Sequence, residues 1–425
     1  MISGFKVSNF RSFQKETSVE IRPLTLFFGF NNSGKSALLR ALPLIGDSLC
    51  SNARSPIALD SEAAGGGIYR DLTGDVAFGA GRTIKFNVCI TIEGLEYSVS
   101  WHVNDIPERR IQVIGNVTIF SDNRCIWKAT WKPELTDSGV SYEYEIEQEG
   151  VAVQTLELKF RGLVPEKVPT ISTDARIVFE NLRELGGNVM WMHAVRKTPP
   201  RGIKPRGTSP TFPGTHGEET LEILSADAIL SSWGKLGNFV SNWYEAIGRN
   251  LVPSWEGDLF ALKSFPISGN GSSATLFPDS GEGLIQVLPV LVSLALASRG
   301  EGDDPNIICI EEPESHLHPK LHSHLAEAMC EIAKAGRSKL LIETHSENIL
   351  LRVQRAIADG MNPDLVLVYW VRQDSDGRSW IEPVTFDAGG RPSENWPAMV
   401  FSEDIRQAGL LLKSQEERFG KDAAQ

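Results

Sequence analysis

The feature that most constrains this chain is a glycine-rich segment near its N-terminus, Gly29-Phe30-Asn31-Asn32-Ser33-Gly34-Lys35-Ser36. It fits the pattern G-x-x-x-x-G-K-S/T, follows an apolar run that ends at Phe28, and leads into a helical pattern that continues to about Ser48. The small residues of such a loop let backbone N–H groups cup phosphate oxygens at the start of a helix. The segment therefore predicts a nucleotide-binding strand–loop–helix unit, known as a Walker A loop, in an α/β fold.

Two side chains of this loop carry predicted chemistry. Lys35 places a positive charge near the β- and γ-phosphates, and the Ser36 hydroxyl ligates Mg²⁺. The predicted cofactors are thus ATP and Mg²⁺, and the predicted contacts are Phe30, Asn31, Asn32, Ser33, Gly34, Lys35, Ser36 and Ala37. A glycine-rich turn that only starts a helix is the alternative interpretation.

An acidic segment, Glu311-Glu312-Pro313-Glu314, follows the apolar run Ile307–Ile310. A buried strand that ends in acids places carboxylates at the C-terminal edge of a parallel sheet, where ligands of open α/β folds bind. Glu311 is predicted to hold the Mg²⁺ shell through water, and Glu312 to polarise the attacking water as general base. The alternative is a solvated acidic turn.

Two further segments fit a nucleotide site. His345 follows an apolar strand that ends at Ile342, and a histidine at a strand end can hydrogen-bond a γ-phosphate. Ser280, Gly281 and Gly283 open a long apolar helix, whose backbone N–H groups and dipole can bind an anion. A structural histidine and an ordinary helix start are the respective alternatives.

The remaining patterns divide the chain into four segments. Apolar and polar residues alternate over 84–92 and 95–103 around the turn Glu93-Gly94, which predicts a β-hairpin. Helical patterns dominate 173–187 and 217–248, and the C-terminal part alternates apolar strands with helices, which implies a mostly parallel core sheet. The predicted segments are 1–77 (first part of the core), 78–163 (antiparallel β-subdomain), 164–275 (helical, partner-docking insertion) and 276–425 (second part of the core).

The charge balance limits the possible partners. The chain has 42 Lys and Arg against 54 Asp and Glu, a net charge of -12, whereas a protein that coats nucleic acid is normally basic. A basic stretch from Arg196 to Arg206 is either a local contact patch or a solvated loop. We expect no signal peptide and no membrane span, and five cysteines without a CxxC pair favour a cytoplasmic location.

In this order the motifs resemble the ABC-type ATPases, in particular the RecF/SMC/OLD-like branch whose bacterial members are often called AAA family ATPases. The segments that carry the resemblance are Asn9-Phe10-Arg11-Ser12-Phe13, the Walker A loop, the Ser-Gly-x-Gly signature, Ile-Glu-Glu-Pro-Glu-Ser-His-Leu-His-Pro (Walker B) and Glu-Thr-His-Ser-Glu. The likeness covers residues 1–48 and 276–360, and extends more weakly through Asn395-Trp396-Pro397.

The resemblance implies an ABC-type core with an inserted antiparallel β-subdomain and a helical insertion. In this family two protomers sandwich ATP, so Ser280 and Gly281 would act on the nucleotide of a partner, and Arg11 would touch phosphate. One departure concerns the glutamine that the family places after the first helix, because none occurs between Ser36 and Gln112. Asp71 is the predicted substitute.

The resemblance also suggests a role. Similar ATPases are subunits of phage-defence systems of the PARIS or Septu type, which predicts a homodimeric or larger switch that controls a separate effector nuclease and answers to a phage protein or nucleic acid. A RecF-like ATPase that handles DNA ends is the alternative, and a housekeeping regulator is a third reading. A self-contained OLD nuclease would need a Toprim domain, for which residues 360–425 are too few.

Two other groups of residues suggest different chemistry. Four histidines, at positions 316, 318, 322 and 324, invite a metal site, but Pro319 fits the first position of a helix, where His322 and His324 would lie on different faces. Asp374 and Asp376 resemble a nuclease pair, but the surrounding residues read as a hairpin turn.

Overall fold

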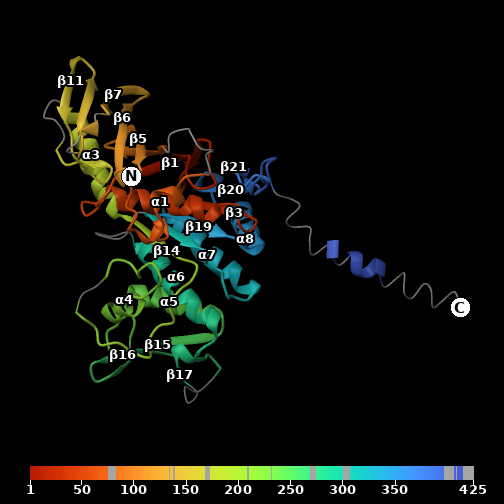
Figure 1. Cartoon of the computed structure of the whole chain (residues 1–425). Coiled ribbons are helices and arrows are strands. Elements are labelled where there is room, and N and C mark those ends of the chain that lie inside the picture. The colour runs from red at the N-terminus through yellow and green to blue at the C-terminus, as the bar shows by residue number, and fades with distance from the viewer. Residues whose placement is uncertain are drawn as a thin grey trace.

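A six-stranded, mostly parallel sheet lies at the centre of the computed structural model (Figure 1). Its order is β14 (Val189–Met192), β18 (Ile307–Glu311), β19 (Lys339–Thr344), β3 (Leu24–Gly29), β20 (Val366–Gln373) and β21 (Ser379–Val384). β21 pairs antiparallel with β20, and the other neighbours pair in parallel. Every residue of β3 is buried, as expected for a strand covered on both faces.

The structure describes the chain except for residues 75–82, 134, 137–138, 168–172, 208–209, 231, 269–273, 300–306, 397–405, 408 and 415–425. Pro397 therefore lies outside the described residues, whereas residues 406–407 and 409–414 near the C-terminus are helical. Short elements among the described residues are η1 (Glu62–Ala64), α2 (Tyr69–Leu72), β8 (Leu135–Thr136), β9 (Gly139–Val140), β12 (Phe160–Arg161), β13 (Val164–Pro165), η2 (Phe277–Asp279) and η3 (Pro363–Leu365).

Helices cover the two faces of the central sheet and form two apolar cores. Phe27 packs into the core that contains α1 (Lys35–Leu49), whereas Leu26 and Phe28 face the other core. That second core contains α6 (Glu282–Arg299), α7 (Pro319–Ala335) and α8 (Glu347–Ala358). By length and composition α6 could cross a membrane, but 72% of it is buried inside the protein, as expected for a core helix.

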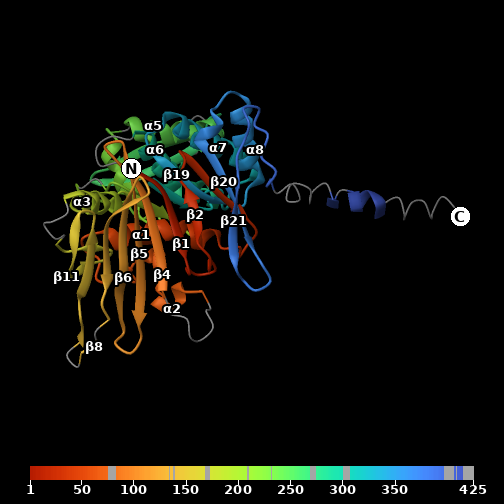
Figure 2. The ribbon, with the colours of Figure 1, turned by 90° about the horizontal axis from the view of Figure 1, so that it is seen from above.

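An eight-stranded antiparallel sheet forms a second layer beside α1, and Figure 2 shows its long strands side by side. Its order is β11 (Val151–Glu157), β10 (Glu143–Gln148), β7 (Arg124–Trp131), β6 (Ile111–Ser121), β5 (Leu95–Ile106), β4 (Thr83–Ile92), β1 (Ile2–Ser8) and β2 (Thr17–Glu20). Glu93 and Gly94 have φ values of 49° and 85°, the left-handed conformation that the two-residue hairpin turn requires. The predicted β-subdomain is thus present, and the N-terminal strands extend it.

The segment predicted as a helical insertion, 164–275, contains strands as well as helices. Its helices are α3 (Thr173–Gly187), α4 (Thr220–Asp227) and α5 (Lys235–Ala246), so the pattern over 217–248 is two helices. The break between them arises because the Asp227 carboxylate accepts hydrogen bonds from the N–H groups of Leu236 and Gly237. The segment also supplies the core strand β14 and a small sheet of β15 (Arg249–Glu256), β16 (Leu259–Pro266) and β17 (Thr275–Leu276).

Candidate active site

The predicted motifs meet at the C-terminal edge of the central sheet. β3 leads into the Walker A loop, β18 ends at Glu311, and β19 ends just before His345. The strand register places Glu311 opposite Glu343, and Thr344 opposite Phe28. Three segments that are far apart in the sequence therefore form one site.

The Walker A loop is held in a wound conformation by its own lysine and by β21. Lys35 is only 3% exposed and its Nζ donates a hydrogen bond to the Phe30 carbonyl at 2.8 Å; burial lowers the pKa of Lys35 from its ordinary value. Gly34 has φ +102°, and a Cβ there would lie 2.8 Å from the Ser379 hydroxyl. Ser379 also donates to the Ser33 carbonyl at 2.7 Å. Ser379 was not found by sequence reasoning, because it lies on the edge strand β21 and outside every motif.

Glu312 and His345 face each other at the edge of the site. His345 Nε2 lies 3.6 Å from Glu312 Oε1, and Ser315 Oγ donates to Glu312 Oε2 at 2.8 Å. The His345 side chain lowers the pKa of Glu312 to about 2. Such a carboxylate is ionised at neutral pH and accepts hydrogen bonds, so it suits the orienting of a water molecule better than the removal of its proton.

Glu311 is fully occupied by neighbouring donors. It is 2% exposed, and Arg40 on α1 binds it in a bidentate pair with N–O distances of 2.5 and 2.7 Å. Trp191 Nε1 donates to the same carboxylate at 3.1 Å, and the Arg40 guanidinium lies 5.1 Å from the Trp191 ring centroid. The predicted role of Glu311 in the metal shell stays a prediction, because in this arrangement its charge is balanced by Arg40.

Removing Arg40 is expected to destabilise the fold, because it leaves the Glu311 charge buried without its partner. Arg40→Met should lower the free energy of unfolding by about 3–5 kcal/mol in urea titrations. The control is Lys334→Met, which breaks an exposed pair with Glu331 and should cost at most about 1 kcal/mol. Equal losses in the two variants would contradict a structural role for the Arg40 pair.

The carboxylate that contacts the Walker A serine is Glu343. Ser36 Oγ donates to Glu343 Oε1 at 2.7 Å, whereas Glu343 Oε2 is buried and has no hydrogen-bond partner among the described residues. Ligand atoms of Glu312, Glu343 and His345 lie within 4.8 Å of one another. Oxygen donors of this kind suit Mg²⁺, so the residues present fit the predicted metal. Sequence reasoning missed Glu343, although a glutamate near the end of an apolar strand is the signal that could have found it.

The basic stretch is tied into the site and into the fold. Arg196 is 4% exposed and donates to the backbone carbonyls of Glu311 at 2.5 Å and Glu312 at 3.2 Å. Arg201 pairs with Asp279 and Arg206 pairs with Glu219. Arg196 is therefore not part of a free contact patch, whereas the exposed Arg201 and Arg206 leave that interpretation a prediction for the rest of the stretch. A count of charges cannot distinguish a buried arginine from a solvated one.

Arg196 also connects the Walker B strand with the signature helix of the same chain. Gln286 on α6 donates to the Arg196 carbonyl at 3.1 Å and to Glu282 at 2.8 Å. Gly283 packs tightly against the loop after Walker B, because a Cβ there would lie 2.3 Å from the His316 carbonyl oxygen. The signature helix and the acidic strand end thus share one hydrogen-bonded link.

The two signature residues before α6, Ser280 and Gly281, differ in exposure. Gly281 is exposed, and a Cβ added to it would meet no described atom within 4 Å. The Ser280 N–H donates to the Phe277 carbonyl, and its buried hydroxyl has no partner among the described residues. This leaves room at the start of α6 for an anion from outside the chain.

Two predicted residues have other contacts in this structure. Arg11 Nη2 donates to the carbonyls of Ala63 and Ala64 at 3.3 and 3.1 Å. Asp71 accepts a hydrogen bond from the Ile68 N–H and so caps its own short helix. A phosphate contact by Arg11 and a metal-sensing role for Asp71 remain predictions.

The two alternative chemistries are not favoured by the structure. His318 accepts the Lys320 N–H and caps α7, and His322 contacts Ser346 Oγ at 2.7 Å, so both have structural roles. Asp374 Oδ1 accepts the N–H groups of Asp376 and Arg378, as in a hairpin turn. These contacts agree with the sequence analysis, which placed His322 and His324 on different faces of a helix and interpreted Asp374 and Asp376 as part of a hairpin turn.

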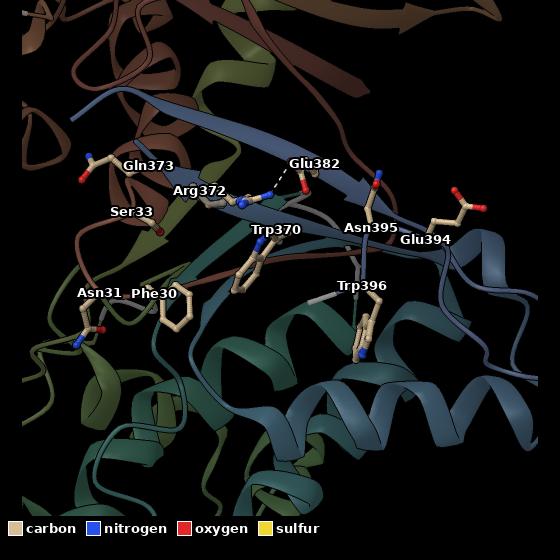
Figure 3. Close-up of a pocket in the computed structure, with 11 residues that line it drawn as sticks. Phe30, Asn31, Ser33, Trp370, Arg372, Gln373, Glu382, Glu394, Asn395 and Trp396 are labelled. Atoms are coloured by element: carbon tan, nitrogen blue, oxygen red, sulfur yellow. Dashed lines mark hydrogen bonds and ion pairs between the residues drawn. The ribbon is translucent and has the colours of Figure 1, made fainter. Parts of the chain in front are cut away.

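A cavity of about 800 Å³ adjoins the Walker A loop, and Figure 3 shows its aromatic lining. Phe30 and Asn31 line it together with Trp370, Arg372 and Trp396. The Phe30 side chain is 60% exposed, and its ring meets the Trp370 ring edge-on at a centroid distance of 5.5 Å. Aromatic surface is therefore accessible directly beside predicted nucleotide contacts.

Comparison with known proteins identifies similar sequences and a similar fold. Residues 1–88 and 242–350 match the family of AAA ATPase domains. The chain is 22% identical over 417 residues to an OLD nuclease from Thermus scotoductus, covering 92% of this chain and 68% of that protein. An SMC head solved with the C-terminal winged-helix domain of ScpA superposes with a TM-score of 0.51 at 11% identity, covering 91% and 98% of the two chains. The predicted fold class is confirmed: the chain has an SMC head-like, ABC-type ATPase fold with an inserted antiparallel sheet.

Proposed function

We propose that this chain binds and hydrolyses ATP as the switch subunit of a bacterial anti-phage defence system and controls a separate effector nuclease. The observation that carries the ATPase part is the meeting of Lys35, Ser36, Glu312 and His345 at one edge of the central sheet. Lys35 and the loop N–H groups bind the phosphates, Ser36 and nearby carboxylates hold Mg²⁺, which neutralises phosphate charge, and Glu312 orients the attacking water.

We infer that ATP holds two copies of the chain together in the cytoplasm. The open surface at Gly281 supports this, since the start of α6 offers N–H groups and a positive dipole end to a γ-phosphate bound by a partner. A second copy would thereby complete each ATP site. The trigger that shifts this equilibrium, a phage protein or a nucleic acid, must bind the two states with different affinity.

The defence role rests on likeness to the OLD nuclease and on the motifs. That protein is matched over 68% of its length. Asp374 and Asp376, the carboxylate pair considered for a nuclease, are engaged in a turn. The acidic net charge of -12 also disfavours independent binding of DNA.

The purified chain is expected to hydrolyse ATP slowly and to cut no nucleic acid by itself. The test incubates it with plasmid, single-stranded DNA and tRNA, with ATP and either Mg²⁺ or Mn²⁺. Cleavage that survives Glu312→Gln but disappears in Asp374→Ala/Asp376→Ala would make the chain its own nuclease and overturn the proposal. ATP hydrolysis stimulated by DNA ends, without any effector, would favour the RecF-like alternative.

A further inference from the structure

Two strand-end carboxylates lie side by side at the proposed ATP site, and their surroundings differ sharply. Glu311 on β18 and Glu343 on β19 are paired in register, and each is 2% exposed. The Glu311 oxygens are occupied by Arg40 and Trp191. One Glu343 oxygen accepts a hydrogen bond from the Ser36 hydroxyl, and the other has no partner in the part of the chain that the structure describes. Of these two carboxylates, Glu343 is the one with an oxygen left for a further ligand.

We propose that Glu343, rather than Glu311, supplies the carboxylate that holds Mg²⁺ beside Ser36. This inference rests on the proposed function, because the metal would arrive with ATP. A serine hydroxyl and a carboxylate oxygen that already contact each other are two ligands directed at one place, next to the phosphate-binding loop. Mg²⁺ prefers such oxygen ligands and commonly uses one or two carboxylates together with substrate phosphates.

The charges around Glu343 point the same way. The charged groups that act on Glu343 are the carboxylates of Glu311 and Glu312 and the cations Lys35 and Arg40. An unpartnered carboxylate oxygen in a buried place is costly, and a divalent cation offsets that cost. Glu312 and His345, whose ligand atoms lie within 4.8 Å of Glu343, complete the polar surroundings.

Glu311 has a different task in this arrangement. Its bidentate pair with Arg40 joins β18 to α1, the helix that begins at the Walker A loop. Its carbonyl also accepts from Arg196. Glu311 therefore positions the loop, the helix and the acidic strand end relative to one another, and Glu343 is left to meet the cation.

The test compares Mn²⁺ affinity of the ATP-loaded protein, followed by electron paramagnetic resonance, in wild type, Glu343→Gln and Glu311→Gln. We expect Glu343→Gln to weaken Mn²⁺ binding by at least about 10- to 100-fold, because a loss of this size already follows when a residue that only supports a metal ligand is changed. We expect Glu311→Gln to change Mn²⁺ affinity much less. A glutamine can still accept the Ser36 hydrogen bond, so unchanged Mn²⁺ affinity in Glu343→Gln would reduce Glu343 to a residue that only positions Ser36 and would overturn the proposal.

Two further measurements separate the possible failures. ATP affinity in EDTA should be unchanged or higher in Glu343→Gln, because a negative charge near the phosphates is removed. A wild-type protein that binds no ATP with or without metal would overturn the proposed function itself.

Glu343→Asp keeps the charge on a shorter side chain and covers the case in which the glutamine variant does not fold. It should also weaken Mn²⁺ binding while retaining ATP affinity in EDTA. Full Mn²⁺ affinity in a folded aspartate variant would contradict a direct ligand at this position.

Discussion

Replacing Lys35 with alanine is expected to abolish ATP binding. Lys35 is the cation of the Walker A loop, it is buried to 3% exposure, and its Nζ already lies at the loop carbonyl of Phe30. This lysine also faces Glu343 and Glu312, whose negative charges repel a triphosphate once the lysine is removed. The variant therefore loses the attraction between Lys35 and the phosphates, and the repulsion between the carboxylates and the phosphates is no longer offset.

Isothermal calorimetry with ATP and Mg²⁺ measures this effect directly. Lys320→Ala is the matched control, because Lys320 is an exposed lysine at the start of α7 and should leave ATP affinity at the wild-type value. Binding by Lys35→Ala with wild-type affinity would mean that the loop is not a phosphate site.

Glu312→Gln is expected to bind ATP but to turn it over at least about 10²-fold more slowly, since general acid–base groups contribute about 10²–10⁴-fold. The substitution keeps the size of the side chain and removes the charge that orients the attacking water. Phosphate release measures the turnover, and light scattering with ATP should show the mass of a dimer, because the variant cannot leave the ATP state.

Glu311→Gln provides the comparison for this prediction. If it stopped turnover in a folded protein while Glu312→Gln hardly changed it, the roles of the two neighbouring acids would be reversed. The φ of +38° at Glu312 is relevant here, because this left-handed backbone turns the chain immediately after β18 and directs the two side chains to different neighbours.

The sequence predicted those parts of the site that are local in the chain. The Walker A loop, the acidic end of β18 and His345 after β19 each follow an apolar strand, so periodicity and strand-end position were enough to find them. The hairpin of β4 and β5 was equally accessible, because Glu93-Gly94 fits its turn. Because these strands are parallel neighbours, their C-terminal ends meet at one sheet edge, so the three segments come together without any long-range signal in the sequence.

The contacts that assign different roles to the acidic residues of the site could not be predicted from local sequence patterns. Arg40 and Glu311 are 271 residues apart, and Arg196 and Glu311 are 115 apart, so nothing local to either segment indicates the pairing. β14 has four residues, too few to show a period, and it was missed although it lies in the core sheet. Burial also changed the interpretation of Arg196, because its guanidinium donates to the backbone carbonyls of Glu311 and Glu312 inside the molecule.

The link through Arg196 has a consequence for how two ATP sites would communicate. Gln286 belongs to the helix whose start would meet a partner's nucleotide, and Arg196 holds the backbone of the acids that serve the chain's own nucleotide. In the proposed sandwich, a shift of α6 caused by one ATP molecule would therefore move the hydrolytic residues at the other. Each protomer would couple the two nucleotides mechanically. The two sites would then hydrolyse ATP together rather than independently, and hydrolysis at one site would weaken the contacts of both protomers with the nucleotides.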